Sequence, residues 1–385
     1  MPVTGIICEY NPLHLGHKKQ LDTVRQTIGA DSGIVCLMSG SFVQRGHPAI
    51  LDKSYRAKAA ILSGADLVLE LPVTYALSSA EGFAAGGVSI LGQFCDYLCF
   101  GSETADKVQL LSTAQALLSE GFPPALRQFL DHGLSFPAAR QAALESMGLS
   151  GALLSNPNDI LAVEYCKAIL SQGCAMEPLP IRRGGSYHAA AADPDNPSAT
   201  ALRDLILHSG AWLDYVPLEA RDVLRSAPIH TLEAGERAVL ARLRTMTEAE
   251  FSALPYGSEG LWRKLMHAAR RCASLEEIAS AVKSKRYTRT RIDRMLMCAF
   301  LGLTEADLAA PAPYVRVLAF NDRGREILKA ARKTGLFPNI GESLEDPYQQ
   351  IEHRCGDLYG LFAQDAPESA GAEARQRVFY QSHIL

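Results

Sequence analysis

The chain has 385 residues, of which 48% are hydrophobic and 21% charged, and its formal net charge at pH 7 is -4. These values are ordinary for a soluble globular protein and favour two domains, and they exclude a uniformly basic nucleic-acid coat but not a local basic face. No run approaches eighteen apolar residues, and no basic segment at the start precedes an apolar stretch. We therefore expect neither membrane insertion nor export, and we expect a cytoplasmic location.

The first half of the chain alternates short apolar runs with helical patterns, which predicts an α/β fold with helices covering a mostly parallel sheet. Strands are expected at residues 3–8, 33–39, 66–71, 96–100 and 177–182, the fourth of them stopped by Gly101. Helices are expected at residues 16–28, 53–63, 75–91, 105–120, 124–131 and 157–171. The segment 75–91 is rich in Ala, Ser and Gly, so we expect it to pack closely against the sheet.

Beyond about residue 205 the strand signal nearly vanishes and amphipathic helices dominate. One late strand is expected at 314–320, and helices are expected at residues 218–225, 236–243, 258–273, 275–282, 289–301 and 325–333. We therefore predict a first domain of residues 1–205 and a mainly helical second domain of residues 206–385. A tail rich in Ala, Glu and Gln, about 365–378, is expected to be loosely held.

Two histidines bracket Leu15 and Gly16 in the stretch CEYNPLHLGHKKQ, directly after the first expected strand. The carboxyl end of such a strand and the N-terminus of the next helix form a crevice where free N–H groups and the helix dipole favour an anion. His14 and His17, three residues apart, face one side of the first turn and can donate to phosphate oxygens, as between the α- and β-phosphates of ATP. The alternatives are a surface histidine beside a capping histidine, or a zinc pair, for which no third ligand lies nearby.

A second candidate phosphate motif is PSATALR, residues 197–203. Hydroxyls at Ser198 and Thr200 open an expected helix and Arg203 lies one turn in, so hydroxyl, amide and guanidinium donors can converge on an anion. By itself this stretch is typical of an ordinary N-cap. Its pairing with the histidine motif favours the β- and γ-phosphates of the same nucleotide, which requires both motifs to close around one triphosphate.

The stretch SGSFVQRGHPAILDK, residues 39–53, follows the second strand at the same sheet edge as the histidines. Its polar groups either bind a small carboxylate or a flipped cytosine, or belong to a loop that caps the next helix. Glu70, at the end of the third strand, is either a structural hydrogen-bond acceptor or a member of the site. The polar groups in question are Ser39, Gly40, Ser41, Gln44, Arg45, Asp52 and Lys53.

The nine cysteines are dispersed, mostly inside apolar runs, and no two form a Cys-x-x-Cys pair. This pattern predicts buried thiols in a reducing compartment and argues against a disulfide framework or a zinc site. No dedicated metal-ligand motif is visible, so we predict no metal site.

The strongest cluster of positive charge is KSKRYTRTRIDR, residues 283–294, which contains one acid, Asp293, and one aromatic ring, Tyr287. Such a run supplies contacts to RNA phosphates and a ring for stacking, although by itself it is more typical of a solvated helix face. A weaker candidate is ARKTG, with Arg332 and Lys333. The expected RNA contacts are Lys283, Lys285, Arg286, Arg289, Arg291 and Arg294.

Five blocks follow one another through the first 205 residues: GIICEYNPLHLGH, MSGSFVQRGHPAILDKSYRAKAAILSGADLVLELP, FGSE, NPNDILAVEY and YHAAAADPDNPSATALR. In this order they resemble the bacterial tRNA(Met) cytidine acetate ligase family, within the HIGH-type nucleotidyltransferase superfamily. The resemblance implies a cytoplasmic enzyme with a Rossmann-like, ATP-binding catalytic domain followed by a tRNA-binding domain. Such an enzyme uses ATP, accompanied by Mg2+, to activate acetate as acetyl-adenylate, and acetylates N4 of the wobble cytidine of elongator tRNA(Met).

Carried over by position, the resemblance implies catalytic roles at the phosphates for His14, His17, Ser198, Thr200 and Arg203. Gly101 would lie against the nucleotide, the amide of Asn158 would face the base or ribose, and Arg182 or Arg183 would bind phosphate. The chain has Asp159 where the family more often has Asn. The implied ATP cradle consists of Ile7, Cys8, Glu9, Tyr10, Asn11, Pro12, Leu13, His14, Leu15, Gly16, His17, Lys18, Lys19 and Gln20.

Two other functions stay open at this point. One is a small-molecule adenylyltransferase of the same fold, in which the helical half serves dimerisation. The other is a non-catalytic RNA-binding protein with a vestigial nucleotide site. The pair of phosphate motifs weighs against the second, and the helical half with its basic run weighs against the first.

Overall fold

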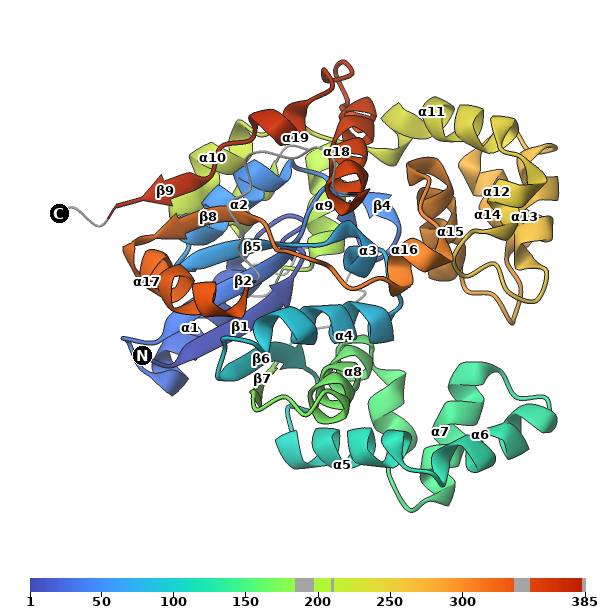
Figure 1. Cartoon of the computed structure of the whole chain (residues 1–385), viewed down its shortest axis with the longest axis horizontal. Helices are drawn as coiled ribbons and strands as arrows, with labels where there is room; N and C mark the ends of the chain where they lie inside the picture. The colour runs from blue at the N-terminus through green and yellow to red at the C-terminus, as the bar shows by residue number, and fades with distance from the viewer. Residues whose placement is uncertain (184–196, 209–210, 336–346, 383–385) are drawn as a thin grey trace.

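The computed structural model describes residues 1–183, 197–208, 211–335 and 347–382 (Figure 1). Within them seven strands form one sheet in the order β7-β6-β1-β2-β5-β8-β9. All neighbouring strands pair in parallel except β5 and β8, which are antiparallel. The α/β class with a mostly parallel sheet is therefore confirmed. The strands are β1 (Val3–Cys8), β2 (Gly33–Ser39), β5 (Leu67–Leu71), β6 (Tyr97–Ser102), β7 (Glu177–Arg182), β8 (Val317–Asn321) and β9 (Phe379–Gln381).

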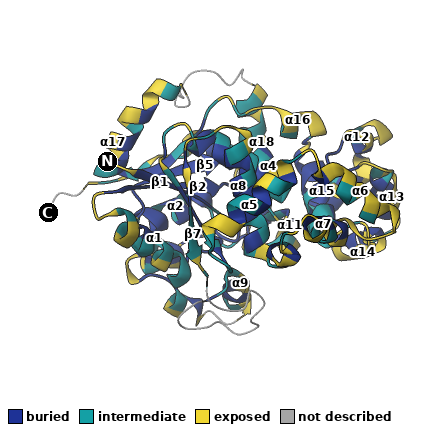
Figure 2. Ribbon diagram, turned by 90° about the horizontal axis from the view of Figure 1, so that it is seen from below, coloured by how far each residue is buried: buried dark blue, intermediate teal, exposed yellow. Residues whose placement is uncertain are grey.

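Helices cover both faces of this sheet, and the alternation of side chains along β2 explains why. Val35 and Leu37 belong to the hydrophobic core under α4 and α8, whereas Cys36 and Met38 belong to the core under α1 and α2. Every residue of β2 is buried, so the strand reads as a continuous apolar run. Figure 2 shows the central strands in the colour of buried residues. The covering helices are α1 (Leu15–Ile28), α2 (Lys53–Leu62), α4 (Ala80–Leu91) and α8 (Pro157–Ser171).

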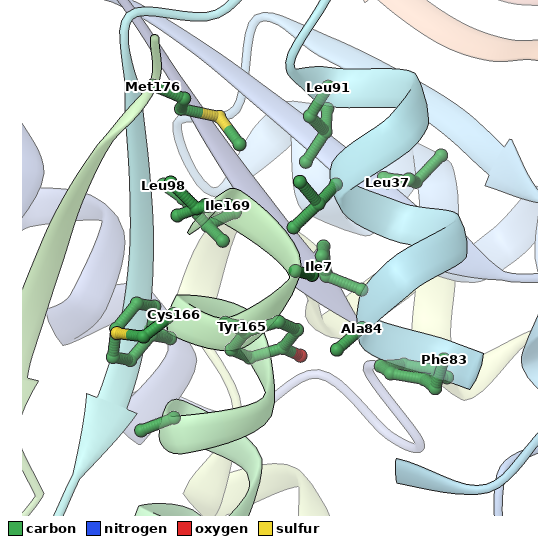
Figure 3. Close-up of a cluster of buried hydrophobic side chains, with 14 of the residues drawn as sticks. Ile7, Leu37, Phe83, Ala84, Leu91, Leu98, Tyr165, Cys166, Ile169 and Met176 are labelled. Carbon is green, nitrogen blue, oxygen red and sulfur yellow. The ribbon is translucent and has the colours of Figure 1, made fainter. Parts of the chain in front are cut away.

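Helix α4 lies very close to the sheet, as its small residues predict. A Cβ atom on Gly87 would come within 2.3 Å of the side chain of Ile7, so a larger residue there would push the helix away. Figure 3 shows the layer in which α4, α8 and the strands meet. The single helix expected at 75–91 is two helices, α3 (Val73–Ala76) and α4, because the side chain of Ser79 accepts the N–H of Gly82 and begins a new helix.

Several further elements differ from the expectations. Strand β6 continues through Gly101, which pairs with Ile181, instead of stopping there. A short antiparallel hairpin of β3 (Phe42–Val43) and β4 (His47–Pro48) was not predicted, nor was helix α7 (Phe136–Ser146). Helix α7 follows α5 (Lys107–Leu118) and α6 (Phe122–Asp131), which lie near the expected positions.

A lobe of helices follows the first domain and has its own hydrophobic core, which also takes in Phe42, Val73 and Leu77 from the sheet half. None of the described helices has the length and apolar character needed to cross a membrane. The lobe and its connection comprise α9 (Ala199–His208), α10 (Arg221–Arg225), α11 (Leu232–Thr245), α12 (Glu248–Ser252), α13 (Leu261–Ala269), α14 (Leu275–Val282), α15 (Arg289–Leu301) and α16 (Glu305–Ala309).

The chain then returns to the sheet, so the boundary expected near residue 205 does not separate sheet from helices in space. Strand β8 pairs with β5, and β9 extends the same edge. The segment expected to be loosely held contains Glu373, which is 3% exposed and bonds to Lys53 in α2. The returning helices are α17 (Asp322–Ala331), α18 (Pro347–Tyr359) and α19 (Ala372–Arg375).

Candidate active site

The β1–α1 loop, residues 9–14, leaves the carboxyl end of β1 and ends at His14, the N-cap of α1. Nδ1 of His14 accepts a hydrogen bond from the backbone N–H of Gly16 at 3.1 Å. Nδ1 of His17 accepts the backbone N–H of His14 at 3.3 Å, so the two side chains form a reciprocal capping box. The capping role left open by the sequence thus applies to both histidines, and it uses only one nitrogen of each ring.

The two imidazoles stack with their centroids 3.7 Å apart. Burial, reinforced by the charges of Arg183 and Arg203, lowers the pKa of His14 to about 3. Burial, with the neighbouring His14 and Arg183, also lowers the pKa of His17 well below its ordinary value. Both rings are therefore neutral near pH 7, and since each Nδ1 accepts a backbone N–H, each proton lies on Nε2.

One of these donors has no hydrogen-bond partner among the described residues. Nε2 of His14 is buried and lacks a hydrogen-bond partner within the described part of the chain. A buried donor left unsatisfied costs about 1–3 kcal/mol, and such groups in native proteins call for an explanation. An acceptor oxygen on a ligand at the N-terminus of α1 would satisfy this N–H.

The second phosphate motif lies against the first, although the two are far apart in the sequence. Nη1 of Arg203 donates to the backbone carbonyl of Asn11 at 2.8 Å, across a separation of 192 residues. Nη2 of Arg203 donates to the hydroxyl of Thr200 at 3.0 Å. Ser198 caps α9 by accepting the N–H of Ala201 at 3.1 Å. The guanidinium of Arg203 therefore shares the β1–α1 loop with His14, as the sequence predicted.

The two arginines at the end of β7, Arg182 and Arg183, have different hydrogen-bond partners. Nη1 of Arg183 donates to Oδ1 of Asn158 at 3.2 Å, and its charge acts on both histidines. Arg182 turns the other way and donates to the backbone carbonyls of Glu103 and Thr104 at 3.3 and 3.0 Å. The structure therefore brings Arg183 close to Asn158 and the histidines, and a phosphate contact of either arginine stays a prediction.

The expected nucleotide-facing positions Gly101 and Asn158 lie beside Arg183. A Cβ atom on Gly101 would be 3.5 Å from the Arg183 side chain, so the strand passes directly under this arginine. The amide of Asn158 donates to Oε1 of Glu103 at 2.7 Å while its oxygen accepts from Arg183. Positions on β6, β7 and α8 thus meet at one end of the sheet.

Glu103, in the stretch FGSE, has a structural role that was not predicted from the sequence. Its carboxylate accepts the backbone N–H of Asp159 at 2.8 Å and so caps α8. Asp159 is fully buried and accepts bonds from Ser102 and Thr104, which lower the pKa of its carboxyl against the raising effect of burial. Asp159 therefore fixes the loop after β6. For Glu103, the signal available in the sequence was an acid shortly after a glycine at the end of a strand.

The remaining members of the expected cradle have mixed positions. Tyr10 and Leu13 lie in the core under α1 and α2, and Ile7 in the core under α4 and α8. Lys18 pairs with Asp22 at 2.5 Å. The others are distributed as follows: Cys8, Glu9, Leu15, Gly16 and Gln20 are half-buried, Asn11 and Pro12 are buried, and Lys19 is exposed.

Arg56 is a second residue for which the sequence predicted no role. Its hydrogen bonds connect the ends of neighbouring strands. The side chain is fully buried on α2. Its guanidinium donates to the backbone carbonyls of Glu9 at 2.7 Å, Ser39 at 3.0 Å and Leu51 at 2.8 Å, and also to that of Gly40. These bonds fix the end of β1 relative to the end of β2.

One role considered for Lys53 was to bind a small carboxylate, but its ammonium is already paired with two carboxylates of the protein. Its ammonium is 2.6 Å from Oε1 of Glu70 and 2.6 Å from Oε1 of Glu373, and all three side chains are buried. Glu70 is thus a structural acceptor, the other alternative considered above. A pocket of about 360 Å³ borders Glu70 and Glu373 on the far side of this network, lined also by Tyr314 and Arg316.

The basic run of residues 283–294 is largely paired with acids and carbonyls from other parts of the lobe. Arg286 pairs with Glu259, and Arg289 pairs with both Glu276 and Asp293. Lys283 and Lys285 are exposed, Arg291 donates to the carbonyl of Tyr256, and Arg294 lies over the ring of Tyr256.

Within residues 1–183, 197–208, 211–335 and 347–382, no group of three or more His, Cys, Asp and Glu side chains is arranged to hold a metal ion. All nine cysteines fall in these ranges and are free thiols. Burial raises the pKa of several of them, with that of Cys99 at about 12. The thiols whose pKa is raised are therefore protonated and unreactive near pH 7.

Comparison with known proteins gives one consistent result. The family described as HIGH Nucleotidyl Transferase matches residues 1–374. The tRNA(Met) cytidine acetate ligase of Alkaliphilus metalliredigens is 36% identical, with 97% of each chain covered. The tRNA(Met) cytidine acetate ligase of Clostridium acetobutylicum is 37% identical, with 88% of this chain and 90% of the relative covered.

Two solved structures resemble the whole chain. Thermotoga maritima TmcAL in its apo form has a TM-score of 0.90 at 28% identity, and covers 99% of this chain and 100% of its own. Thermotoga maritima TmcAL bound with alpha-thio ATP has a TM-score of 0.86 at 29% identity, with the same coverage. The fold that carries the histidine loop therefore also occurs in a protein that holds an ATP analogue.

Proposed function

This chain belongs to the HIGH nucleotidyltransferase family and, within it, to the tRNA(Met) cytidine acetate ligases, and on that premise we propose that it acetylates a cytidine of tRNA(Met) with ATP and acetate. An acetate oxygen attacks the α-phosphorus of ATP, and the bond to the β-phosphate oxygen breaks to release pyrophosphate. N4 of the wobble cytidine of the elongator tRNA then attacks the acetyl carbon of acetyl-adenylate. AMP leaves with the electrons of the broken C–O bond, and N4 loses a proton.

The observation that carries this proposal is the meeting of the two phosphate motifs. The Nε2–H of His14, which has no partner among the described residues, lies at the end of the β1–α1 loop, and the guanidinium of Arg203 donates to the carbonyl of Asn11 in the same loop. The two residues lie near opposite ends of the first 205 residues of the sequence. Arg183 adds a second cation within range of both histidines. A triphosphate is an anion that accepts from all of these donors at once, and phosphate transfer needs mainly such positioning and charge stabilisation.

In this proposal the neutral imidazoles and the charged arginines have different roles in the site. Because His14 and His17 are uncharged donors, their hydrogen bonds do not depend on pH near neutrality, and the arginines supply the compensating charge. We assign the two Nε2–H groups to the oxygens around the bridge between the α- and β-phosphates, where negative charge builds up as the bond breaks. Arg203, with Ser198 and Thr200, belongs to the β- and γ-phosphates.

The other end of the nucleotide belongs to β6 and α8 in this proposal. Gly101 leaves room beside Arg183, and the amide of Asn158 has donor and acceptor atoms suited to a base or ribose. Mg2+ enters as the counter-ion of ATP, held mainly by phosphate oxygens, since the described residues contain no cluster that would hold it as a resident metal. No step of the reaction is assigned to it.

For RNA we propose the loop and first turn of α15 within residues 283–294. Lys283 and Lys285 are exposed, and Arg286 and Arg289 form exposed ion pairs that an RNA phosphate can compete with. Arg291 and Arg294, whose guanidinium groups contact Tyr256, act in this scheme by positioning that ring.

The test incubates the protein with ATP, labelled acetate and bulk tRNA, then digests the RNA and looks for N4-acetylcytidine. Labelled acetylcytidine supports the proposal. Transfer of AMP to a small metabolite indicates an adenylyltransferase instead, and binding of tRNA without turnover indicates an RNA-binding protein.

The matched variants are His14→Asn and His132→Asn. Asparagine still caps a helix, so His14→Asn keeps the start of α1 while removing the Nε2–H. We expect at least a hundredfold loss of turnover in this variant with unchanged tRNA affinity. His132, an exposed histidine at the end of α6, is the control. Equal losses in both variants contradict the assignment.

A further inference from the structure

We propose that the β3–β4 hairpin, residues 42–48, is an RNA-backbone clamp whose contact residue is Arg45, which holds the phosphate next to the nucleotide under modification. This inference rests on the proposed function and adds a contact outside the basic run of α15. It assigns to the hairpin a role that links the two halves of the molecule at the entrance to the histidine site.

The hairpin is tied to the β1–α1 loop at two points. The backbone N–H of Gln44 donates to Oε1 of Glu9 at 2.7 Å. Just beyond the hairpin, the backbone N–H of Ile50 donates to Oδ1 of Asn11 at 2.8 Å. Asn11 is also the residue whose carbonyl holds Arg203. Two backbone donors thus register the hairpin against the loop that carries His14.

The other side of the hairpin rests on α15, and Figure 1 shows β4 between the sheet and this helix. Gly46 has φ +79, and a Cβ atom there would lie 2.4 Å from the backbone of Asp293 and Arg294. Nε2 of His47 is 3.8 Å from the carboxylate of Asp293. The turn therefore packs directly against α15, the helix that contains part of the expected RNA-binding run, and leaves no space for a side chain at Gly46.

Positive charge gathers where these elements meet. The charges of Arg45, Arg203 and Arg289 all act on His47, and the charge of Asp293 opposes them there. Arg203 faces the β1–α1 loop and Arg289 pairs with Asp293 and Glu276, so their positions are fixed by the protein. Arg45 is the exposed member, at the tip of the turn.

The geometry favours an RNA phosphate as the ligand of Arg45. A base that enters the histidine site brings its sugar and flanking phosphates to the entrance, because they are covalently joined to it. The unit that meets them there is a hairpin bonded on one side to the β1–α1 loop and packed on the other side against α15, which fixes the backbone of Arg45. Arginine binds phosphate with two parallel hydrogen bonds, so a fixed arginine orients the strand as well as attracting it.

The experiment measures tRNA affinity as a function of salt for the wild type, Arg45→Ala and Arg45→Lys, and separately measures acetate-dependent ATP–pyrophosphate exchange without tRNA. Loss of one phosphate contact lowers the slope of log affinity against log salt by about 0.7, which corresponds to about a fivefold weaker affinity at 0.1 M salt. We expect this result for Arg45→Ala and recovery of most of the slope in Arg45→Lys.

Arg325→Ala is the matched control, because Arg325 is an exposed arginine on α17, away from the hairpin (Figure 1). An unchanged slope and affinity in Arg45→Ala overturn the inference. Loss of exchange with intact tRNA affinity also overturns it, and assigns Arg45 to ATP or acetate. Affinity is measured without turnover, so a wild type that binds tRNA but forms no N4-acetylcytidine refutes the proposed function and leaves this test readable.

Discussion

The acid stability of the protein is expected to depend on His14. In the folded chain, burial and the charges of Arg183 and Arg203 hold the pKa of this ring at about 3, whereas a histidine in an unfolded chain titrates near 6.5. Below pH 6.5 the unfolded chain gains a proton that the folded ring does not accept. The contribution of His14 to the free energy of unfolding is therefore fully present above pH 6.5 and is lost as the pH falls toward 3.

The size of the effect follows from linkage. Each pH unit between the two pKa values changes the free energy of unfolding by about 1.4 kcal/mol, so the loss from His14 between pH 6.5 and pH 4.5 is about 3 kcal/mol. Urea unfolding of the wild type and His14→Asn at pH 7.0 and pH 4.5 measures it. We expect the wild type to lose about 3 kcal/mol more than the variant over this interval.

Nitrogen NMR of histidine-labelled protein gives a direct check, with the His14→Asn spectrum identifying the signal. The expected spectrum has an unprotonated Nδ1 and a protonated Nε2 that do not change between pH 7 and pH 4.5. A His14 signal that titrates near pH 6.5, or an acid-induced loss of stability equal in both proteins, refutes the reasoning about burial and the neighbouring arginines.

Three further predictions concern single side chains. Arg183→Ala is expected to raise KM for ATP about 10- to 100-fold in ATP–pyrophosphate exchange and Arg182→Ala less than about threefold, since only the first guanidinium faces the histidines. Arg56→Met leaves buried carbonyls without a donor and is expected to lower the free energy of unfolding by about 3 kcal/mol in urea titrations; an unchanged midpoint contradicts the role assigned to it. Gly46→Ala is expected to lower the thermal midpoint more than Gly173→Ala, because both positions have positive φ but only the first meets the backbone of α15, and equal shifts would show that the contact is unimportant.

Local sequence was sufficient for much of the sheet. The bounds of β1, β2, β7, α8, α14 and α15 agree with the expected ranges, because most of them are periodic or apolar runs with a glycine, a proline or a capping residue at one end. The β3–β4 hairpin has two residues in each strand, too few for any periodicity to show. The return of β8 and β9 to the sheet is a long-range pairing, which no local pattern encodes.

The same distinction applies to the site. His14, His17 and Arg203 were found because their chemistry is carried by their own side chains at recognisable spacings. Arg56 was missed because its partners are backbone carbonyls that only the folded sheet brings together.

The basic run shows the opposite error, in which a local pattern overstates the charge. Arg286 and Arg289 look like part of an unopposed cationic stretch in the sequence. In the structure, Glu259 from the turn before α13 and Glu276 from α14 pair with them. A charge cluster read from one segment omits the acids that folding brings from elsewhere.

The late arrival of β8 and β9 has a consequence for biosynthesis. While the protein is being made on the ribosome, β5 has no antiparallel neighbour until Val317–Asn321 has emerged, and Lys53 lacks one of its two carboxylates until Glu373 follows. The nascent chain must therefore keep an open strand edge and a half-matched buried ammonium through most of translation, which is the period when a growing chain is most exposed to chaperones and to aggregation. Completion of the nucleotide half thus waits until the whole helical lobe has been made.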